Sequence, residues 1–554
     1  MHRRHVPAAL AHLLLCAFAL AAPTLAAPFL PLPQGPLPLP VAPPENPTTA
    51  EKVVLGKMLF WDEQLSSDGT MACGTCHQPS AGGADPRLDA NAAHPGPDGL
   101  VGTQDDVFGS PGMLRSNAFG HFVEDATFGF DAQATDRNTP SMIAAAYFPE
   151  LFWDGRAADA FVDPVGGGVS IAAGAALESQ SLQPLLSDVE MAWEGRGWDG
   201  VTTRLAGAVP MALAGSLTFD MQAALTGDPT YPDLFEAAFG SDEITPVRIA
   251  FALAAYQRTL VPDQSKFDRV MRGQDQFTQA EQRGFNAFRN PGTRCVQCHS
   301  GSLFSDGEYH NLGLRPIAED SGRQAVTGLF ADRGRFKTPS LRNVELRERF
   351  FHTGAPGIDD LRDVMDFYNA DGGPFGANKD PLLNGIMIPP PVRNDLVAFL
   401  RTLTDPRVAA EAAPFDRPTL WSERFAANPA PLGIGGVAGT GGFVPQIVAT
   451  APPKQGNPGF RVGLHGATGG SFTLLHVDLL SIPAGATTAD LRHGLPLAQV
   501  VVGTGAGAGH ATWIDADAVD PVLVGLTYEA QWWVRDAAAP GGIARSPLVR
   551  VTIE

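Results

Sequence analysis

The sequence predicts a mostly α-helical fold of two related domains in tandem, followed by an all-β sandwich domain. Three observations predict it. A pentapeptide of the form C-x-x-C-H occurs twice, at Cys73–His77 and Cys295–His299, and each copy follows a stretch with helical periodicity. Beyond about residue 412 the composition changes to Pro, Gly, Ala and Val with alternating apolar residues, which is typical of strands. The chain has 554 residues, enough for three domains.

Residues 1–27 predict a secretory signal peptide. They begin with Arg3 and Arg4, continue through an apolar stretch and end in small residues. This apolar run is too short for a permanent span, and no later segment has about 18 consecutive apolar residues. Residues 28–47 are proline-rich and predict an extended lead-in. We therefore expect a periplasmic or otherwise exported protein without a membrane span.

The mature chain is strongly acidic. The net charge is −20, and removing the leader takes away two arginines and no acidic residue, which makes it −22. Nucleic acid and anionic membrane surfaces are poor partners for such a charge, whereas a basic electron-donor protein would be attracted to it.

The first helical domain is predicted over residues 48–270. Thr48 and Glu51 have the spacing of a capping box, and an apolar stripe follows at helical spacing. Another helix is predicted to begin at Thr245-Pro246 and to end near Leu260.

The second helical domain is predicted over residues 271–412. A capping box at Thr278 and Glu281 opens one helix, and a last helix is predicted around Leu396, before Asp405-Pro406. A weak internal repeat relates the two domains, because a glycine is followed four residues later by a phenylalanine before each pentapeptide. These pairs are Gly56/Phe60 and Gly284/Phe288.

The C-terminal region is predicted to be a glycine-rich linker, residues 413–445, and a β-sandwich, residues 446–554. Apolar residues alternate along three segments, at 460–464, 526–534 and 549–553. Four histidines of this region have no metal-ligand spacing, and we predict surface or turn positions for them. They are His465, His476, His493 and His510.

The two pentapeptides predict two covalently bound c-type haems. Two thiols at this spacing can each add to a haem vinyl group, and the next histidine can bind the iron as proximal ligand. The residues concerned are Cys73, Cys76 and His77 for one haem, and Cys295, Cys298 and His299 for the other. The alternatives are a zinc site of four cysteines and a dithiol/disulfide pair. Zinc leaves both histidines unexplained, and no βαβ pattern surrounds either pair.

Five ordered blocks give the region from about Glu51 to Asp405 a specific family resemblance. They are LGKMLFWDEQLSSDGT before the first pentapeptide, RNTPSMIAAAYFPELFWDGRA (137–157), VEM (189–191), GRFKTPSLRNV (334–344) and FFHTG (350–354). With these blocks the chain resembles the bacterial di-haem cytochrome c peroxidase superfamily, in its MauG-like branch. The resemblance implies two cytochrome c-like domains, in which the N-terminal haem reacts with hydrogen peroxide and the C-terminal haem supplies electrons.

The resemblance also implies two catalytic residues. Trp153 matches the tryptophan that relays electrons between the haems. Glu190 matches a distal-pocket glutamate. Cleavage of the peroxide bond needs a proton moved from one oxygen to the other, and a carboxylate over the iron can carry out both halves of that transfer. A Gly/Ala-rich insertion near residues 166–176 lengthens the chain between Trp153 and Glu190.

The far side of the C-terminal haem separates the branches of this superfamily. Ordinary members place a methionine there. In the segment LRDVMDFYN (361–369), Tyr368 takes its place, as in MauG-like members. Met365 is the competing ligand, and a tyrosine exposed on a helix is the remaining alternative. A phenolate ligand implies a lower reduction potential and oxidising equivalents shared between the two haems.

Ordinary peroxidases also carry a histidine seven residues before the Arg-Asn pair, which closes the peroxide haem until reduction opens it. Here that position holds Phe130, so an open, five-coordinate N-terminal haem is expected. His94 and His121, in an inserted loop, are possible substitutes.

The family's calcium ion is held by the asparagine of the Arg-Asn pair and by two backbone carbonyls ahead of the Phe-His block. Asn138, Arg347 and Arg349 match these positions. Because carbonyl oxygens are the ligands at the last two, their side-chain identity matters little.

Together these features predict an oxidoreductase that reduces hydrogen peroxide to water at the N-terminal haem. Its electrons would pass through the C-terminal haem from a small cytochrome or a cupredoxin. One alternative is MauG-like oxidative modification of a partner protein, which Tyr368 favours. The other is a non-catalytic di-haem electron carrier, in which Glu190 would have no proton to move.

Overall fold

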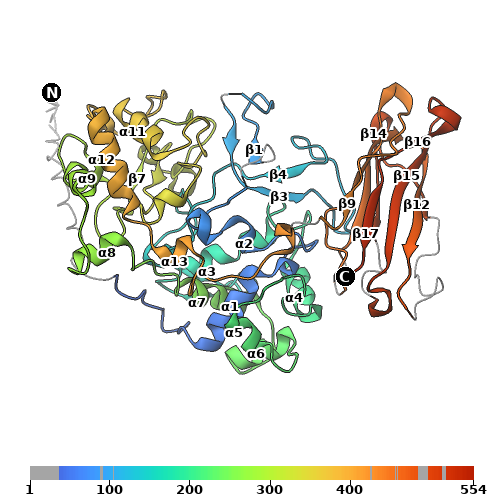
Figure 1. Cartoon of the computed structure of the whole chain (residues 1–554), viewed down its shortest axis with the longest axis horizontal. Coiled ribbons are helices and arrows are strands. Elements are labelled where there is room, and N and C mark those ends of the chain that lie inside the picture. Colours follow the sequence, from blue (N-terminus) through green and yellow to red (C-terminus); the bar gives the residue numbers. More distant parts are fainter. Residues whose placement is uncertain are drawn as a thin grey trace, which may run out of the picture.

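The computed structural model describes residues 37–87, 92–103, 105–424, 427–455, 457, 459–484, 497–514 and 520–554. Two helical regions lie side by side, and a region of strands stands at one end of the molecule (Figure 1). The predicted signal peptide and the first part of the proline-rich lead-in lie outside the described residues. Within these ranges, no helix has the length and apolar character needed to cross a membrane.

The first helical region packs around α1 (Ala50–Trp61) and α7 (Pro246–Gln257). Gly56 allows the two helices to touch, because a Cβ there would overlap the backbone oxygen of Ala252. Thr49 caps α1 by accepting a hydrogen bond from the Lys52 amide, so the cap lies one residue later than predicted. The remaining helices of this region are α2 (Cys73–Cys76), α3 (Ala176–Ser181), α4 (Trp198–Gly207), α5 (Phe219–Ala224) and α6 (Tyr231–Phe239).

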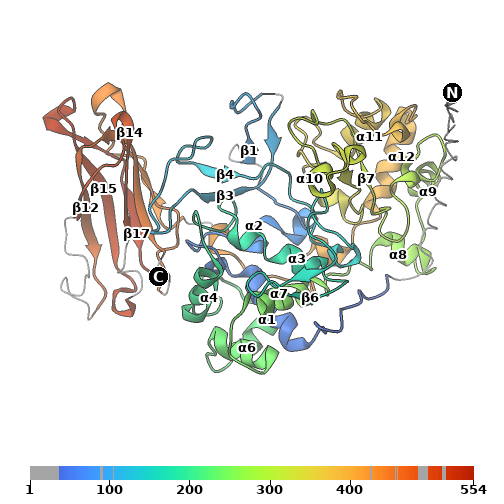
Figure 2. The same ribbon diagram turned by 180° about the vertical axis from the view of Figure 1, so that it is seen from behind.

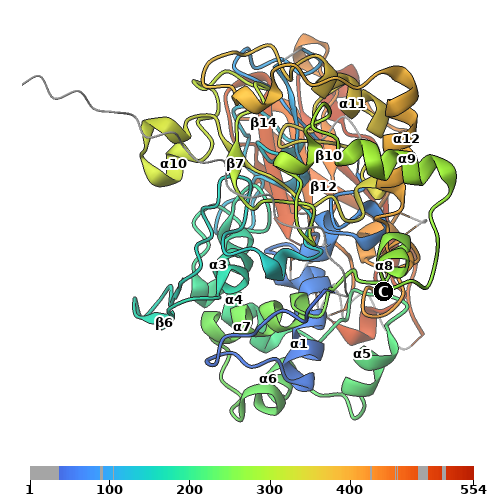
Figure 3. The same cartoon turned by 90° about the vertical axis from the view of Figure 1, so that its left-hand side faces the viewer.

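The second helical region packs around α9 (Gln279–Phe288) and α12 (Pro390–Arg401), which lie above α1 and α7 in Figure 3. The capping box at Thr278 and Glu281 is confirmed. Gly284 lies against the Asp395 backbone oxygen as Gly56 lies against Ala252, which gives the weak repeat a physical reason. The other helices of this region are α8 (Lys266–Met271), α10 (Gln324–Thr327) and α11 (Leu361–Asn369), whereas α13 (Pro406–Ala409) packs Val408 into the core of the first region.

The C-terminal strands form two antiparallel sheets. The first has the order β10 (Gln446–Val448), β11 (Arg461–Gly469), β14 (Gly505–Ile514). The second has the order β13 (Leu497–Val500), β12 (Phe472–Ser481), β15 (Thr527–Arg535), β17 (Val549–Thr552), β9 (Ala430–Pro431), and β16 (Ile543–Arg545) pairs with β15. One hydrophobic core joins side chains from both sheets, such as Leu464 and Trp532, so the strands form a sandwich. We call these strands the β-sandwich.

The segment predicted as a linker is built into its neighbours. Phe415 and Leu420 are buried in the core of the first helical region. Further along, Ala430 and Pro431 pair with β17 at the edge of the larger sheet. The sandwich is therefore attached closely to the first helical region.

Short hairpins complete the fold. The pairs β1 (Ala93–His94) with β2 (Val107–Phe108) and β3 (Pro111–Leu114) with β4 (Ala132–Ala134) come from the loop after the first pentapeptide. In both Figure 1 and Figure 2, the β3–β4 hairpin lies between α2 and the β-sandwich. The predicted insertion near residues 166–176 contains β6 (Val169–Ile171), which pairs with β5 (Phe161–Val162) just before it, and β7 (Tyr309–His310) pairs with β8 (Phe336–Lys337).

Candidate haem sites

The first pentapeptide lines a large cavity in the first helical region. Cys73 and Cys76 belong to α2, and Gly74 between them leaves no room for a Cβ against the indole ring of Trp61. His77 Nδ1 lies 3.1 Å from the carbonyl oxygen of Gly83. Since a carbonyl only accepts, Nδ1 carries the proton and Nε2 has its lone pair free for a metal. Burial lowers the pKa of His77, which keeps the imidazole neutral.

The second pentapeptide repeats this arrangement in a second cavity. His299 Nδ1 lies 3.0 Å from the Phe304 carbonyl oxygen, and burial lowers the pKa of His299 as well. Cys295 and Cys298 line the same cavity. Each site thus presents two thiols and one oriented, neutral imidazole to an enclosed space, which fits a c-type haem.

The zinc and disulfide alternatives do not fit these surroundings. The four cysteines that the structure describes form no disulfide, and each pair lines its own cavity. Burial raises the pKa of Cys73 to about 12 and that of Cys295 to about 11, so these thiols stay protonated. Protonated thiols are poor zinc ligands and slow in disulfide exchange.

Glu190 lies in the wall of the first cavity, as the sequence predicts. It belongs to a turn in which its amide donates to Ser187 Oγ at 3.3 Å. Burial raises the pKa of the Glu190 carboxyl, against a smaller opposing effect of the Ser187 hydrogen bond. The carboxyl therefore binds a proton more readily than an exposed glutamate does, which suits a group that takes up and releases protons.

The inserted loop supplies another part of this wall. His94 and Phe128 line the cavity, and their rings meet edge to face with centroids 5.6 Å apart. His94 Nδ1 lies 2.9 Å from the Pro95 carbonyl oxygen, which leaves Nε2 as an acceptor. His121 is exposed instead. Of the two possible substitute histidines, His94 is the one that reaches the cavity.

Phe130 is not among the residues that line the cavity. Its ring stacks on His465 with centroids 4.9 Å apart, and the His510 ring lies 5.3 Å away. The prediction of surface or turn positions is therefore wrong for His465 and His510, which lie on β11 and β14 and cover Phe130. His493 lies outside the described residues.

Trp153 lies between the two cavities and lines both. Its Nε1 donates to the Asn138 carbonyl oxygen at 2.6 Å, and its own carbonyl accepts from the Lys337 amide at 2.7 Å. The ring is almost fully buried and meets the His352 ring edge to face with centroids 6.2 Å apart. This position agrees with the predicted relay between two haems.

The sequence assigns no role to two titratable residues that line the cavities. Lys337 lines both cavities and donates from Nζ to the Glu150 carbonyl oxygen at 2.7 Å, and burial lowers its pKa to about 7. The block GRFKTPSLRNV carries it, but its pattern gives no role. His310 lines the second cavity with Nδ1 2.6 Å from Asp380 and Nε2 3.0 Å from Asp306. Burial opposes the charge of His310, but the two carboxylates outweigh it and raise its pKa to about 12.

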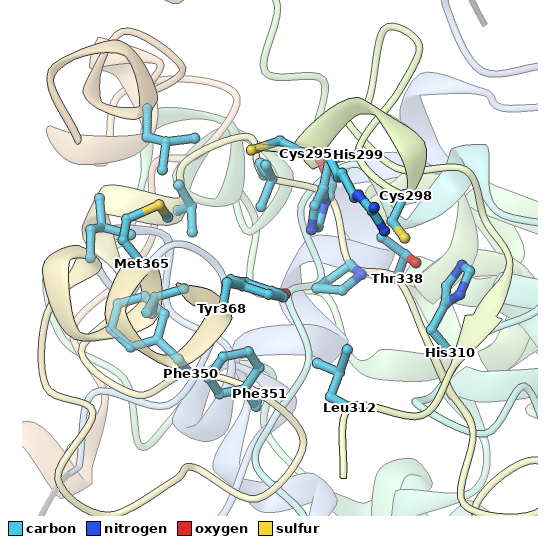
Figure 4. A pocket seen from close by; sticks show the side chains of 18 of the residues that line it. Cys295, Cys298, His299, His310, Leu312, Thr338, Phe350, Phe351, Met365 and Tyr368 are labelled. Atoms are coloured by element: carbon cyan, nitrogen blue, oxygen red, sulfur yellow. The ribbon is translucent and has the colours of Figure 1, made fainter. Parts of the chain in front are cut away.

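The second cavity contains both candidates for the sixth iron ligand, on α11. Figure 4 shows the ring of Tyr368 reaching into the pocket beneath His299, with its hydroxyl toward the centre. Met365 lies further to the edge, close to the helix. Burial raises the pKa of Tyr368, so its phenol is neutral unless a positive charge lies close to it. The structure places Tyr368 in the pocket and not on an exposed helix face.

The predicted calcium ligands are partly brought together. Asn138 Nδ2 donates to the carbonyls of Phe351 at 3.0 Å and Arg349 at 3.4 Å. Turning an asparagine amide by 180° presents its oxygen in place of its nitrogen, so this position suits a cation held with carbonyl oxygens. Arg347 approaches through its guanidinium, which donates to the Arg349 and Thr139 carbonyls. Calcium stays a prediction.

Comparison with known proteins extends these observations. The family model described as di-haem cytochrome c peroxidase matches residues 50–276. The chain is 30% identical over 422 residues to the cytochrome-c peroxidase IdrP1 of Pseudomonas sp. (strain SCT), covering 70% of this chain and 89% of the relative. It is 32% identical over 369 residues to the methylamine utilization protein MauG of Methylorubrum extorquens, covering 65% and 80%. A crystal structure of a MauG-like protein associated with microbial copper homeostasis matches with a TM-score of 0.48 at 26% identity, covering 70% of this chain and 97% of that one.

Proposed function

Because the chain belongs to the di-haem cytochrome c peroxidase family, which includes the MauG proteins, we propose that it reduces hydrogen peroxide to water at the His77 haem. The two helical regions act as tandem cytochrome c-like domains, and the electrons enter from a small cytochrome or cupredoxin through the His299 haem. The observation that carries this proposal is a partly buried carboxyl, Glu190, in the wall of the cavity that His77 faces.

When bound, each c-type haem supplies an iron that exchanges single electrons. His77 and His299, with the cysteines beside them, would hold and orient this group. The Gly83 and Phe304 carbonyls fix the two imidazoles in the tautomer that offers Nε2, and the flanking cysteines anchor the porphyrin.

Glu190 moves the protons. Reduction of one peroxide molecule takes up two protons and two electrons and gives two water molecules. A carboxyl with a raised pKa accepts a proton from one peroxide oxygen and donates it to the other, the departing one. The Ser187 hydroxyl holds the turn that carries this carboxyl.

Trp153 connects the two sites. Its indole is held by a hydrogen bond at Nε1 and by the Lys337 amide at its carbonyl, so its ring stays between the two cavities. A buried, oriented indole in this position suits a stepwise electron route. An electron carrier without catalysis would need this route but not Glu190.

We propose the cellular compartment of the protein from its sequence. The N-terminal leader supports export to the periplasm, where c-type haem is attached. A calcium ion held by Asn138 and neighbouring carbonyls would tie the two helical regions together next to Trp153.

The second candidate function is MauG-like oxidation of a partner protein. Tyr368 favours it, because its phenol points into the second cavity, which His299 also lines. Oxidised residues in proteins that co-purify with the chain, found by mass spectrometry after peroxide treatment, would support this candidate.

The decisive comparison for peroxide reduction is Glu190→Gln against Glu194→Gln. Glu194 lies four residues further along, with its side chain about half exposed and paired with Arg115. We expect kcat/KM for peroxide to fall by about 10²–10⁴-fold in Glu190→Gln, with unchanged haem content, and to stay unchanged in Glu194→Gln. Equal activity of the two variants would refute the proton-transfer role, and a wild-type protein without turnover would favour the electron carrier.

A further inference from the structure

The β-sandwich contacts the part of the chain that builds the peroxide pocket. We propose that it is a positioning element of that pocket, which holds the hairpin segment 111–134 and, through it, the turn that carries Glu190. The proposal rests on the proposed function where it assigns peroxide chemistry to Glu190. It gives a role to a domain, and to two histidines, that the haem sites alone leave unexplained.

The first step is the contact between the sandwich and the hairpin segment. The Phe122 amide donates to Thr512 Oγ1 at 2.9 Å, and Arg461 donates from Nη1 to the Gly120 carbonyl at 2.8 Å. The Arg461 guanidinium also lies over the Phe122 ring, 4.4 Å from its centroid. Phe122 and Arg461 are both buried, so these contacts form a packed interface.

Phe130 adds a second anchor close to the cavity. Its ring stacks on His465 at an interplanar angle of 21°. Two residues earlier, Phe128 points to the other side and lines the cavity beside His94. A tight turn holds Phe128, because Asp125 and Gly129 exchange two backbone hydrogen bonds and the Asp125 carboxylate accepts from the Phe128 amide at 2.9 Å.

The base of the hairpin is bonded to the residues around Glu190. The Met113 amide donates to the Val189 carbonyl at 2.9 Å. Gln133 Nε2 donates to the Asp188 carbonyl at 2.8 Å. On the other side, the Glu194 amide donates to the Ser116 carbonyl at 2.8 Å. The hairpin segment is therefore hydrogen-bonded to the chain both before and after Glu190.

Arg461 makes a second connection to the same turn. Its Nη2 pairs with Asp68 Oδ2 at 3.1 Å, and both side chains are almost fully buried. The neighbouring Ser67 donates from its amide to the Met191 carbonyl at 2.9 Å and accepts from the Trp193 amide at 2.8 Å through Oγ. One sandwich residue therefore supports the Glu190 turn through two separate segments.

The same contacts determine where the Phe130 side chain lies. By the family resemblance, Phe130 occupies the position of the closing histidine of ordinary peroxidases, and here its ring packs against His465 of the sandwich. The sandwich therefore holds the Phe130 side chain outside the cavity, so this position places no side chain in the His77 site.

The test compares four variants of the full-length holoenzyme. His465→Ala and Phe130→Ala remove the stacking from either side, and His465→Phe restores an aromatic partner. His476→Ala is the matched control, because His476 lies on β12 and stacks on Trp533 within the sandwich. The readouts are amide hydrogen exchange of residues 111–134 and 187–194 and the rate constant for peroxide.

We expect exchange in both segments to become about two- to tenfold faster in the two alanine variants that lose stacking, with a slower reaction with peroxide. His465→Phe and His476→Ala should match the wild type. Faster exchange confined to the hairpin, with residues 187–194 and the peroxide rate unchanged, would overturn the proposal. Hydrogen exchange does not depend on turnover. If the wild type is inactive with peroxide, the proposed function is refuted, but the exchange rates still show whether the sandwich supports the Glu190 turn.

Discussion

Arg137 joins the two helical regions beside Trp153. Its Nη1 donates to Asp154 at 2.6 Å, and Nε and Nη2 donate to the two oxygens of Asp320 at 2.8 and 2.7 Å. The side chains are 15%, 6% and 9% exposed for Arg137, Asp154 and Asp320. Asp154 belongs to the first region and Asp320 to the second, so this triad spans the contact between them.

Replacing Arg137 by methionine keeps much of the side-chain volume but takes its cation away from the buried Asp320 and leaves Asp154 with Arg156, which is 44% exposed and 3.2 Å away. Removing one partner of a buried pair costs about 3–5 kcal/mol. The matched control is Arg283→Met. Arg283 makes the same two-pronged contact with Asp395, but its side chain is 59% exposed, so its loss should change the stability very little.

The difference between these variants should depend on pH. Burial alone would raise the pKa of Asp320, but the hydrogen bonds and charge of Arg137 lower it below its usual value. A carboxyl with a lowered pKa contributes stability that is fully present above its unfolded pKa of about 3.9 and is lost as the pH falls through its folded pKa. Without Arg137, burial raises the pKa of these carboxyls with less opposition, so they take up protons at a higher pH. The loss of stability caused by Arg137→Met is therefore smaller in acid than at pH 7.

Thermal and urea unfolding of the holoenzyme at pH 7 and at pH 4 measure this effect. We expect Arg137→Met to be much less stable than wild type at pH 7, the gap to narrow at pH 4, and Arg283→Met to stay near wild type at both. Equal losses of stability in the two variants, or a difference that does not change with pH, would show that the Arg137 triad does not stabilise the contact between the two regions.

Three further predictions concern the haem sites. Tyr368→Met should change the spectrum of the His299 haem and raise its reduction potential, whereas Met365→Leu should change neither; an unchanged spectrum in Tyr368→Met would remove the ligand assignment. Gly74→Ala should lower stability by about 1–3 kcal/mol and reduce haem attachment at Cys73, measured by unfolding and intact mass, because the added methyl overlaps the Trp61 ring. A calcium chelator should lower the melting temperature of the wild type but not that of Asn138→Ala; an equal decrease in both would count against calcium at this position.

The sequence predicts those features that depend on neighbouring residues. The capping box at Thr278 and Glu281 and the helix after Thr245 are local patterns, and both occur where expected. The pentapeptides are local too, so each places two thiols and a histidine at one cavity. At the first helix, two adjacent threonines compete for the cap, and the pattern alone does not distinguish Thr49 from Thr48.

Contacts between distant parts of the chain could not be predicted in this way. Phe130 meets His465 across more than three hundred positions, and neither residue lies in a recognisable motif. The alternation at 460–464 predicts a strand next to His465, but no pattern predicts the strand that carries His510, and the face that each histidine covers depends on how the sandwich docks. Lys337 lies in the segment GRFKTPSLRNV, but only the fold shows that it lines both cavities.

Electron paramagnetic resonance of the fully oxidised protein can show whether the chain carries two different haem sites. We expect two haems per chain, one high-spin ferric signal from an open His77 site and one low-spin signal from the His299 site. One equivalent of hydrogen peroxide should remove the high-spin signal. Two low-spin signals that do not respond to peroxide, or a protein matured in a haem-attaching host that carries no iron, would contradict this expectation.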